Sequence, residues 1–513
     1  MLSRPTPSNT KQPKLSPLTP TYILRAHSAP VSVLHFTRDG RFLLSGDTDG
    51  FVAIWDLKTF RPLYFWRAHG TGGTSAVGEG QGVLGVEELG GMGGVLTQGR
   101  DNSLRLYRLP VTSAAPSTAG IAPATSVPSP SAPSNGLEQE WEMDINAMNF
   151  CRVGILRLSG MGERENSHEK GRNDKGLEDG SQGEEALVAV VSLTKDEFVD
   201  IFHYPSKARI HRSIGSGAFD VGEKTGSVMA AHLLQLPSTS PISLTPSAPS
   251  SSNHEASSSN SFAPSPTHAQ TLHLLVTYES GHLVLFRFAP PPPSSSSSPA
   301  SAAKFAPSAN GTYDEPMKGK MVQEGEGWAV VWKEKGHKDA VMSLSIDSSK
   351  RFAYTVGADH FVCKYRVFDL NEEEALLPRI LVEETTSPGK AAIAARGDGK
   401  LVAVGGWDGE CRLYSAKTLT PLAVLSHHRS SLQAVAFSPL SPPITLDPRS
   451  SSFSSSAGDA PPFLPIEEDS DDSDTDEEAT KPEGGKETKK RKVWLAAGGQ
   501  EGKISLWEVY SPS

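Results

Sequence analysis

A histidine, a serine and an aspartate lie within one short stretch near the N-terminus, and these residue types together could perform nucleophilic catalysis. They are His27, Ser45 and Asp49, and Trp55 follows them. In a nucleophilic site the histidine takes the proton of the serine hydroxyl, and the aspartate orients the histidine. The same residue types can also form a buried hydrogen-bonded network, which is stable when each polar group has a partner.

Repetition separates these two interpretations. Residues 25–56 align without a gap with residues 335–366, and the four polar and aromatic positions return there as His337, Thr355, Asp359 and Tyr365. A nucleophilic site occurs once in a chain, whereas a structural network returns in each copy of a repeat. We therefore interpret the set as structural, with the turn aspartate accepting from the histidine, the hydroxyl joining them and the indole N–H completing the network.

An acidic turn residue followed six positions later by an aromatic residue recurs along the chain. The pairs are Asp49/Trp55, Asp101/Tyr107, Asp196/Phe202, Asp359/Tyr365, Asp408/Tyr414 and Glu501/Trp507, with a degenerate seventh at Ser280/Phe286. Each pair lies in a strand, tight turn, strand pattern that is typical of a β-hairpin. Three further histidines, His69, His427 and His428, follow outer strands of other repeats. We interpret them as residues that close a four-stranded repeat (a blade) or that lie at the surface.

A further apolar strand precedes each hairpin, such as VSVLHF or INAMNFC, and another follows most of them. Four strands in each of seven repeats predict an all-β fold, a seven-bladed WD40-type β-propeller. The last repeat has no fourth strand of its own, and a lone strand at 21–27 precedes the first repeat. We expect that strand to close the last blade, because this removes an exposed sheet edge. The prediction is a disordered tail at 1–20 and one propeller over 21–513.

Five segments of biased composition interrupt the repeats, at about 110–138, 153–184, 237–270, 289–326 and 440–490. Their Pro- and Ser-rich tracts lack the apolar content that packing needs, so we expect disordered insertions. By strand order they fall between the first and second or between the third and fourth strands of a blade. Both kinds of connection emerge on one face of a propeller, which leaves the opposite face or the rim to dock partners.

The last insertion carries two possible regulatory signals. Within its acidic run at 467–478, Ser470, Ser473 and Thr475 are candidate phosphorylation sites, and a solvated loop is the alternative interpretation. The basic run of Lys489, Lys490, Arg491 and Lys492 is a candidate nuclear localisation signal, although the strand that follows could limit access to it.

Composition argues against several classes of function. The net charge is −10, and the acidic run alone carries nine acidic and no basic residues, so the remainder of the chain is near −1 and has no basic footprint for nucleic acid. No stretch approaches the roughly 20 apolar residues of a membrane helix. The three cysteines form no CxxC pair, and no His/Cys set has metal-ligand spacing. We expect a soluble intracellular protein without catalytic, cofactor or metal sites.

Several blocks of the sequence resemble one known family. The run RAHSAPVSVLHFTRDGRFLLSGDTDGFVAIWDLKTFRPLYFWRAH (25–69) resembles the first blade of the fungal ASTRA-associated protein 1 family of WD-repeat proteins, which is itself similar to guanine nucleotide-binding protein β-like proteins of animals. Further similar blocks are LTQGRDNSLRLYRLP (96–110), INAMNFCRV (145–153) and AAGGQEGKISLWEVY (496–510). The similar blocks lie in the first, second, third and last repeats and leave out the insertions.

The resemblance implies a non-catalytic scaffold subunit of a nuclear assembly, the ASTRA complex, involved in chromatin remodelling and in the assembly of PI3-kinase-like kinases. It implies as partners the telomere-length-regulator co-chaperone trimer, RuvB-like ATPases and a large PI3-kinase-like protein. It also implies a location in the nucleus, with the cytoplasm as a second compartment.

Two other functions of WD40 propellers need sequence features that can be checked in this chain. A substrate receptor of a cullin-type ubiquitin ligase would carry a WDxR motif at the end of a third strand. Trp55-Asp56-Leu57-Lys58 has lysine in place of the arginine, and this alternative stays open. A signalling G-protein β subunit would begin with a coiled-coil helix, whereas residues 1–20 are rich in proline and have no heptads.

Overall fold

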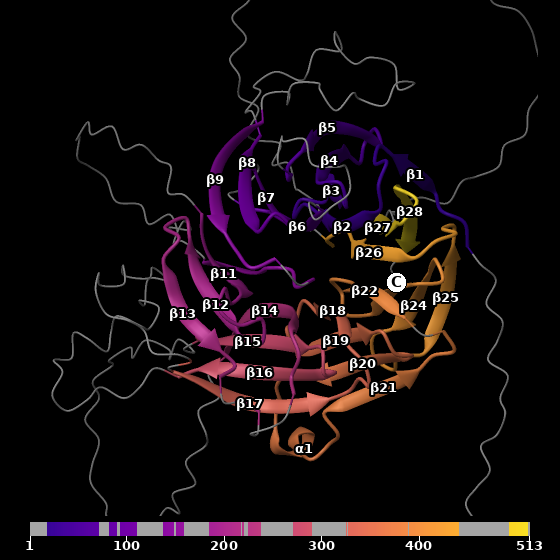
Figure 1. Cartoon of the computed structure of the whole chain (residues 1–513). Helices are drawn as coiled ribbons and strands as arrows, with labels where there is room; N and C mark the ends of the chain where they lie inside the picture. The colour runs from indigo at the N-terminus through magenta and orange to yellow at the C-terminus, as the bar shows by residue number, and fades with distance from the viewer. Residues whose placement is uncertain are drawn as a thin grey trace, which may run out of the picture.

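Seven four-stranded antiparallel sheets surround a central axis in the computed structural model (Figure 1). The predicted seven-bladed propeller is confirmed. The structure describes residues 18–70, 82–89, 93–109, 137–147, 150–158, 184–216, 218–219, 224–237, 270–289, 325, 327–387, 389–440 and 492–510. No helix in this part of the chain is long and apolar enough to span a bilayer.

Each blade runs from an inner strand at the axis to an outer strand at the rim. The first blade is β2 (Val31–Phe36), β3 (Phe42–Asp47), β4 (Phe51–Asp56) and β5 (Arg61–Arg67). The second is β6 (Val83–Glu88), β7 (Gly94–Gly99), β8 (Ser103–Arg108) and β9 (Glu138–Asp144). The third is β10 (Gly154–Leu158), β11 (Glu185–Val191), β12 (Val199–Tyr204) and β13 (Arg209–Ile214).

The later blades repeat this order. The fourth is β14 (Val228–Pro237), β15 (Gln270–Tyr278), β16 (His282–Phe288) and β17 (Trp328–Lys335). The fifth is β18 (Val341–Ile346), β19 (Phe352–Gly357), β20 (Phe361–Arg366) and β21 (Ile380–Glu384), with the short helix α1 (Glu372–Ala375) before β21. The sixth is β22 (Lys390–Ala395), β23 (Leu401–Gly406), β24 (Glu410–Ser415) and β25 (Pro421–Ser426).

The seventh blade joins the two ends of the propeller sequence. It contains β26 (Leu432–Phe437), β27 (Lys492–Gly499) and β28 (Lys503–Tyr510), and its outer strand is β1 (Tyr22–Arg25). β1 pairs antiparallel with β28, with Tyr22 opposite Leu506. This pairing is the closure that the lone N-terminal strand predicted, and it covers the edge of β28.

One residue of the expected N-terminal tail is also part of the fold. Leu18 forms a parallel bridge with Leu425 of β25, where its N–H donates to the Val424 carbonyl oxygen at 3.0 Å. The carbonyl oxygen of Leu18 accepts from Ser426 N–H at 3.2 Å. The chain therefore reaches the outer strand of the sixth blade before it forms β1, and the expectation of disorder up to residue 20 was wrong for this residue.

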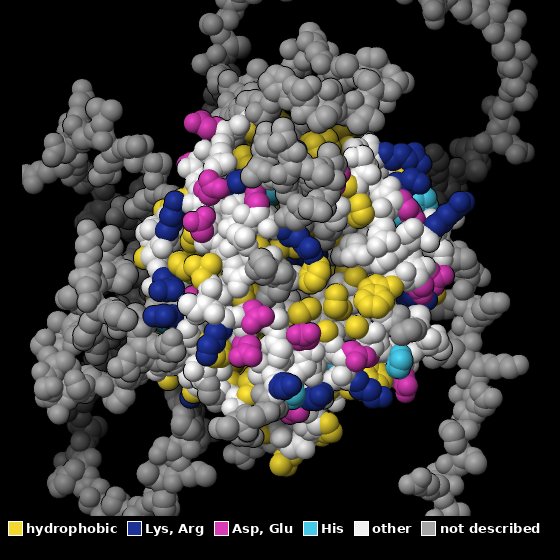
Figure 2. Space-filling view, in the orientation of Figure 1, with side chains coloured by type: hydrophobic (Ala, Val, Ile, Leu, Met, Phe, Trp, Pro, Cys, Tyr) yellow, Lys and Arg dark blue, Asp and Glu magenta, His cyan; other side chains and the backbone are white. Residues whose placement is uncertain are grey.

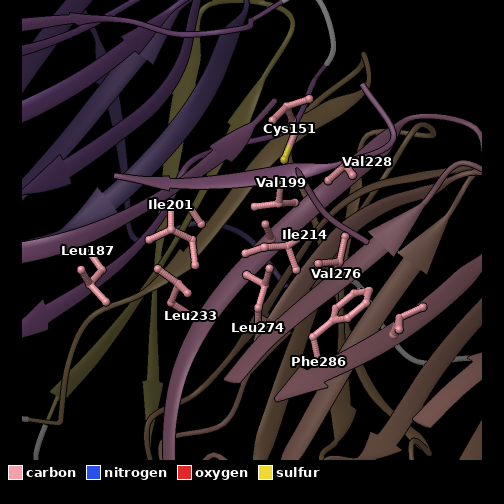
Figure 3. Packing of buried hydrophobic residues seen from close by; sticks show 14 of the residues in the cluster. Cys151, Leu187, Val199, Ile201, Ile214, Val228, Leu233, Leu274, Val276 and Phe286 are labelled. Atoms are coloured by element: carbon pink, nitrogen blue, oxygen red, sulfur yellow. The ribbon is translucent and has the colours of Figure 1, made fainter. Parts of the chain in front are cut away.

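Hydrophobic packing between neighbouring blades forms the core. The second and third strands of a blade are covered on both faces, so they are runs of buried residues, as in β7, whereas outer strands such as β5 are mostly exposed. Figure 3 shows one cluster between the third and fourth blades, in which Ile201 and Ile214 approach Leu233 and Leu274. Leu24 of β1 packs in a cluster with Val31 and Trp55, so apolar burial also stabilises the closure.

The inner strand of the third blade is not where the sequence pattern placed it. The described residues of the strand expected at 145–151 are not in a strand, and Gly154–Leu158, assigned to the insertion beginning near 153, forms β10 instead. The Gln98 side chain explains the difference, because it occupies backbone groups just before β10. Its Nε2 donates to the Cys151 carbonyl oxygen, and its Oε1 accepts from Val153 N–H, both at 2.9 Å.

The remaining parts of the predicted insertions lie outside the described residues except at their ends, where Glu138 belongs to β9, Pro237 to β14 and Gln270 to β15. They fall between β8 and β9, β10 and β11, β14 and β15, β16 and β17, and β26 and β27, which are the predicted kinds of connection. The candidate phosphorylation sites Ser470, Ser473 and Thr475 and the basic residues Lys489, Lys490 and Arg491 also lie outside the described residues, whereas Lys492 is the first residue of β27.

Candidate functional site

The polar set of the first blade forms a buried hydrogen-bonded network. His27 Nδ1 lies 2.7 Å from the Asp47 carboxylate, and His27 Nε2 lies 2.7 Å from Ser45 Oγ. Trp55 Nε1 donates to Ser45 Oγ at 2.8 Å. His27 follows β1, whereas its partners belong to β3 and β4, so the network ties the outer strand of the seventh blade to the first blade.

Asp49 was predicted to be the acid of this network, and that prediction was wrong. The acid is Asp47, and Asp49 donates its backbone N–H to Asp47 Oδ1 at 3.0 Å from the turn. Asp47 is the last residue of β3 and lies opposite the first residue of the inner strand. Four other blades have glycine at that position: Gly99, Gly357, Gly406 and Gly499. An aspartate in place of this glycine was the signal in the sequence that could have identified Asp47.

The glycine in the second and seventh blades leaves room for a histidine. A Cβ added at Gly99 would lie 2.1 Å from His69 Nδ1, and one at Gly499 would lie 2.4 Å from His428 Nδ1. In both blades the acid comes from the turn two residues after the glycine, as Asp101 and Glu501. The acid therefore comes from the end of the second strand when that position is aspartate, as in the first blade, and from the following turn when that position is glycine, as in the second and seventh blades.

His69 and His428 are network members, although the sequence pattern assigned them to blade closure or the surface. His69 contacts Asp101 and Thr97 Oγ1, both at 2.9 Å. Burial raises the pKa of Asp101, but the hydrogen bond and the charge of His69 outweigh it and hold this pKa well below its ordinary value. The predicted aromatic partner Tyr107 donates instead to the Ala68 carbonyl oxygen at 2.7 Å.

The seventh blade has the same arrangement with different residue types. His428 lies 3.0 Å from the Glu501 carboxylate and 2.7 Å from Ser505 Oγ. Trp507, predicted as its aromatic member, is buried in the core between the sixth and seventh blades. The hydroxyl partner is on the third strand here, so a search for a serine or threonine on the second strand would not find it.

The fifth blade brings together three residues that the repeat predicted. His337 lies 2.9 Å from Asp359 Oδ1 and 2.7 Å from Thr355 Oγ1. Burial raises the pKa of Asp359, but His337 and the backbone N–H groups of Phe361 and Lys338 lower it to about 2. Tyr365 is buried beside them, and its ring stacks parallel to Trp332 at 6.4 Å between centroids.

The third and sixth blades depart from the expected pattern. Asp196 is exposed in a turn and accepts from Ser227 Oγ at 2.7 Å, whereas the buried acid of that blade is Asp200. Asp408 pairs with Arg412 at 2.7 Å, and no histidine in the described part of the chain pairs with it. Tyr414 is buried in the core between the fifth and sixth blades. Asp196 and Asp408 are therefore turn residues and do not close a buried histidine network.

The sixth blade holds a buried lysine at a position that is apolar in several other blades. Lys390 begins β22, as Val31 begins β2 and Leu432 begins β26. Its Nζ donates to the Ser387 carbonyl oxygen at 2.7 Å. Burial lowers the pKa of Lys390 to about 8. The sequence pattern did not indicate this residue, because a lysine at the end of a turn is normally solvated.

The networks join strands by hydrogen bonds, and their buried groups are poorly accessible to solvent and substrate. Ser45 and Asp47 have no exposed surface, and His27 is 8% exposed. A nucleophile needs an approach path for the group that it attacks, and the buried Ser45 hydroxyl is occupied by His27 and Trp55. Within the described ranges, no three His, Cys, Asp or Glu side chains are grouped to hold a metal ion.

The candidate functional sites are therefore surfaces of the propeller that could contact other molecules. The first candidate surface surrounds the central axis. A cavity of about 530 Å³ is lined by the inner strands. Near it the guanidinium of Arg100 lies 4.4 Å from the ring centroid of Phe150, and Arg152 donates to the Ser32 carbonyl oxygen at 2.9 Å. Figure 2 shows apolar side chains gathered beside the centre of this face, over β18 and β22.

A second candidate surface lies at the rim. The connection between β20 and β21 carries Leu370, Leu376 and Leu377, which are exposed although they belong to the ordered part of the fifth blade. The sequence patterns did not indicate this surface, because the connection contains neither a repeat residue nor a biased tract. We call these three side chains the rim leucines.

Known proteins resemble this chain in sequence. The family model "WD domain, G-beta repeat" matches residues 18–56. A protein of Penicillium rubens named ASTRA-associated protein 1 is 28% identical over 96% of this chain and 98% of its own length. The protein of that name from Schizosaccharomyces pombe is 26% identical over 83% of this chain and 95% of its own length. The resemblance to the ASTRA-associated protein 1 family is confirmed.

The solved structure of the β-propeller domain of Cps50 (Swd1) from Myceliophteria thermophila is also similar. The alignment covers 96% of this chain and 99% of the chain in that structure. It has 12% sequence identity and a TM-score of 0.46.

Proposed function

We propose that this protein is a non-catalytic scaffold subunit of a nuclear multiprotein assembly that resembles the ASTRA complex. The observation that carries the proposal is similarity along nearly the whole chain to fungal proteins named ASTRA-associated protein 1. By this proposal the assembly acts in chromatin remodelling and in the assembly of PI3-kinase-like kinases. Its subunits include the telomere-length-regulator co-chaperone trimer, RuvB-like ATPases and a large PI3-kinase-like protein.

The physical properties of the ring support a scaffold role. Pairing of β1 with β28 closes the ring, and the buried polar networks join adjacent blades or strands. A rigid body with several exposed surfaces can bind partners without the entropic cost of ordering its own chain at each contact. The polar sets that could have formed a nucleophilic site are buried and have their hydrogen-bonding groups occupied.

Affinity purification of the tagged full-length chain from nuclear extract, followed by mass spectrometry, tests this function. We expect stable recovery of the co-chaperone trimer and the RuvB-like ATPases in amounts comparable to the tagged chain. A purification that yields the chain alone would refute the scaffold proposal. Imaging of the tagged protein tests the nuclear location, with Lys489→Ala, Lys490→Ala and Arg491→Ala combined as the variant for the basic run.

The same purification separates this proposal from a ubiquitin-ligase receptor. Recovery of a cullin and its adaptor would favour the receptor. In the structure the Asp56 carboxylate of the near-match motif accepts from Lys58 N–H at 3.1 Å and from Thr59 Oγ1 at 3.3 Å, so it stabilises its own turn.

A further inference from the structure

The connection between β20 and β21 differs from its equivalents in other blades. In the first, third and sixth blades this connection is a short turn, at 57–60, 205–208 and 416–420. In the fifth blade it covers residues 367–379 and contains α1. The rim leucines Leu370, Leu376 and Leu377 lie in it and are 63%, 87% and 59% exposed. Figure 2 shows apolar side chains at the edge of the molecule where Figure 1 places α1.

Arginines at both ends of the connection hold it in one conformation. Arg366, at the end of β20, pairs with the Asp369 carboxylate and donates to the Leu377 carbonyl oxygen at 3.0 Å. Arg379 donates to Asp369 at 2.9 Å and to the Arg366 carbonyl oxygen at 2.8 Å. Asn371 caps α1, because its Oδ1 accepts from Glu374 N–H at 2.9 Å. Charge-assisted hydrogen bonds of this kind are among the stronger polar interactions in proteins.

The connection is also fixed to the neighbouring blade. Trp332 of β17 donates its Nε1–H to the Val367 carbonyl oxygen at 2.9 Å, and the Arg379 guanidinium lies 5.3 Å from the Trp332 ring centroid. Arg351, which directly precedes β19, pairs with Glu374 of α1. The rim leucines are thus presented on a support that two blades hold in place.

This arrangement keeps apolar surface in water, which a simple connection does not need. Burial of apolar surface is the dominant favourable contribution to most protein association, so three exposed leucines can supply much of the free energy of a contact. Exposed apolar side chains gathered at one place commonly mark sites of protein association. Because the support is already ordered, little conformational entropy is lost when a partner binds.

The charges around the rim leucines determine the kind of partner. Arg351, Arg366 and Arg379 are all engaged in the ion pairs that hold the connection. Glu373 of α1 is exposed and forms no ion pair within the described ranges, and the last turn of α1 has no basic residue. The free charge beside the leucines is therefore negative, and it complements a positively charged partner.

We propose that the rim leucines bind a segment of a partner protein that carries apolar side chains together with lysines or arginines. The inference deepens the proposed scaffold function and rests on it, since it assigns one subunit contact to the rim of the fifth blade. The apolar side chains of that segment cover the rim leucines, and its cations approach Glu373.

Photo-crosslinking of the full-length chain in its own cells identifies the segment. A photoreactive phenylalanine analogue replaces Leu376, and the crosslinked peptide is sequenced by mass spectrometry. We expect a peptide from another protein that contains both apolar residues and lysine or arginine. A crosslink to a second copy of this chain, to another part of the same chain or to an acidic segment would overturn the proposal, as would the absence of any crosslink.

Matched variants test whether the contact contributes to binding. Leu376→Ser with Leu377→Ser removes the apolar surface, and Leu193→Ser, at an exposed leucine in the turn between β11 and β12, is the control. We expect both proteins to keep the wild-type melting temperature, because the replaced side chains are exposed. The double variant should recover at least about tenfold less of the crosslinked protein, because the apolar surface that the partner covers has been removed; tenfold corresponds to about 1.4 kcal/mol.

Charge is tested separately with Glu373→Lys, which should weaken recovery of the same protein and leave the melting temperature unchanged. If the wild-type chain recovers no stable partner, the scaffold function itself fails. If partners are recovered and the double variant recovers them as well as the wild type does, only the assignment to the rim leucines fails.

Discussion

Tyr22 stacks on Phe60 with 3.8 Å between ring centroids, and this contact joins the outer strand of the seventh blade to the first blade. Trp494 of β27 meets both rings edge-on, at 5.9 Å from Tyr22 and 5.5 Å from Phe60. The aromatic group lies beside the pairing of β1 with β28, so side-chain packing and backbone hydrogen bonds act at the same junction. The closure of the ring therefore depends on residues 18–27.

Removal of this segment should destabilise the whole ring. A chain that lacks residues 1–27 loses β1, the buried Leu24 and the network histidine His27, and it exposes the edge of β28. We expect a melting temperature lower by at least about 10 °C, or aggregation, because loss of the Leu24 side chain alone should cost about 2–5 kcal/mol. A chain that lacks only residues 1–17 is the control and should melt like the wild type. Equal melting of both truncated chains would contradict the closure.

Asp47 and Asp49 should differ sharply in their effect on stability. Asp47→Ala leaves His27 and two turn N–H groups without their acceptor, so we expect a loss of about 1–3 kcal/mol in the free energy of unfolding. Asp49→Ala should cost less than about 0.5 kcal/mol, because surface substitutions away from such networks are nearly neutral. Urea denaturation of both variants measures the difference. A larger loss for Asp49→Ala would reverse the assignment made from the structure.

Asp359 should contribute to acid sensitivity. The pKa of Asp359 falls from 3.8 to about 2 on folding, so its stabilising effect is present above pH 4 and is lost as the pH falls towards 2. Asp359→Asn should lower the free energy of unfolding at pH 7 by about 2 kcal/mol and flatten the decline between pH 4 and 2. Denaturation measured across this range checks both effects. Asp339→Asn, at an exposed aspartate in the preceding connection, should leave the wild-type curve unchanged.

Lys390 should make stability depend on pH in the alkaline range, because its charged form is the destabilising one. Its pKa is lowered from 10.5 to about 8 by burial, so between these values the unfolded chain binds more protons than the folded chain, and stability rises with pH. Lys390→Met should stabilise the fold most at or below pH 8, and its advantage should shrink as the pH approaches 10. Urea denaturation at several pH values gives the comparison, with Lys400→Met as the exposed control. An advantage that does not change with pH would show that the charge of Lys390 is not the cause.

The long connection between β26 and β27 should be dispensable for folding. Phe437 pairs with Leu495, and Ser438 N–H donates to the Trp494 carbonyl oxygen at 2.8 Å, so the two strand ends already lie side by side. A short Gly/Ser bridge in place of residues 441–491 should therefore leave the melting temperature within about 3 °C of the wild type, because loop-closure entropy changes slowly with length. Loss of soluble protein on this replacement would show that the connection contributes to the fold.

The sequence by itself determined the architecture. Strands alternate with a period of two, and the acid-to-aromatic spacing repeats through the chain, so the hairpins and the number of blades follow from local patterns. The closure by the N-terminal strand follows from counting strands. The last repeat has only three strands of its own, and the strand at 21–27 belongs to no other repeat. Such features depend on residues that are near one another in the chain.

Only the tertiary structure decided which polar groups meet. Asp47 and Asp49 are two positions apart, and the course of the backbone at the end of β3 decides which carboxylate reaches His27. His428 and Ser505 are far apart in sequence, and they meet because the connection from β25 to β26 passes beside β28 of the closed seventh blade. The rim leucines are exposed because arginines from the ends of two strands fix the connection that carries them. These outcomes depend on the relative placement of distant segments, which local sequence patterns do not encode.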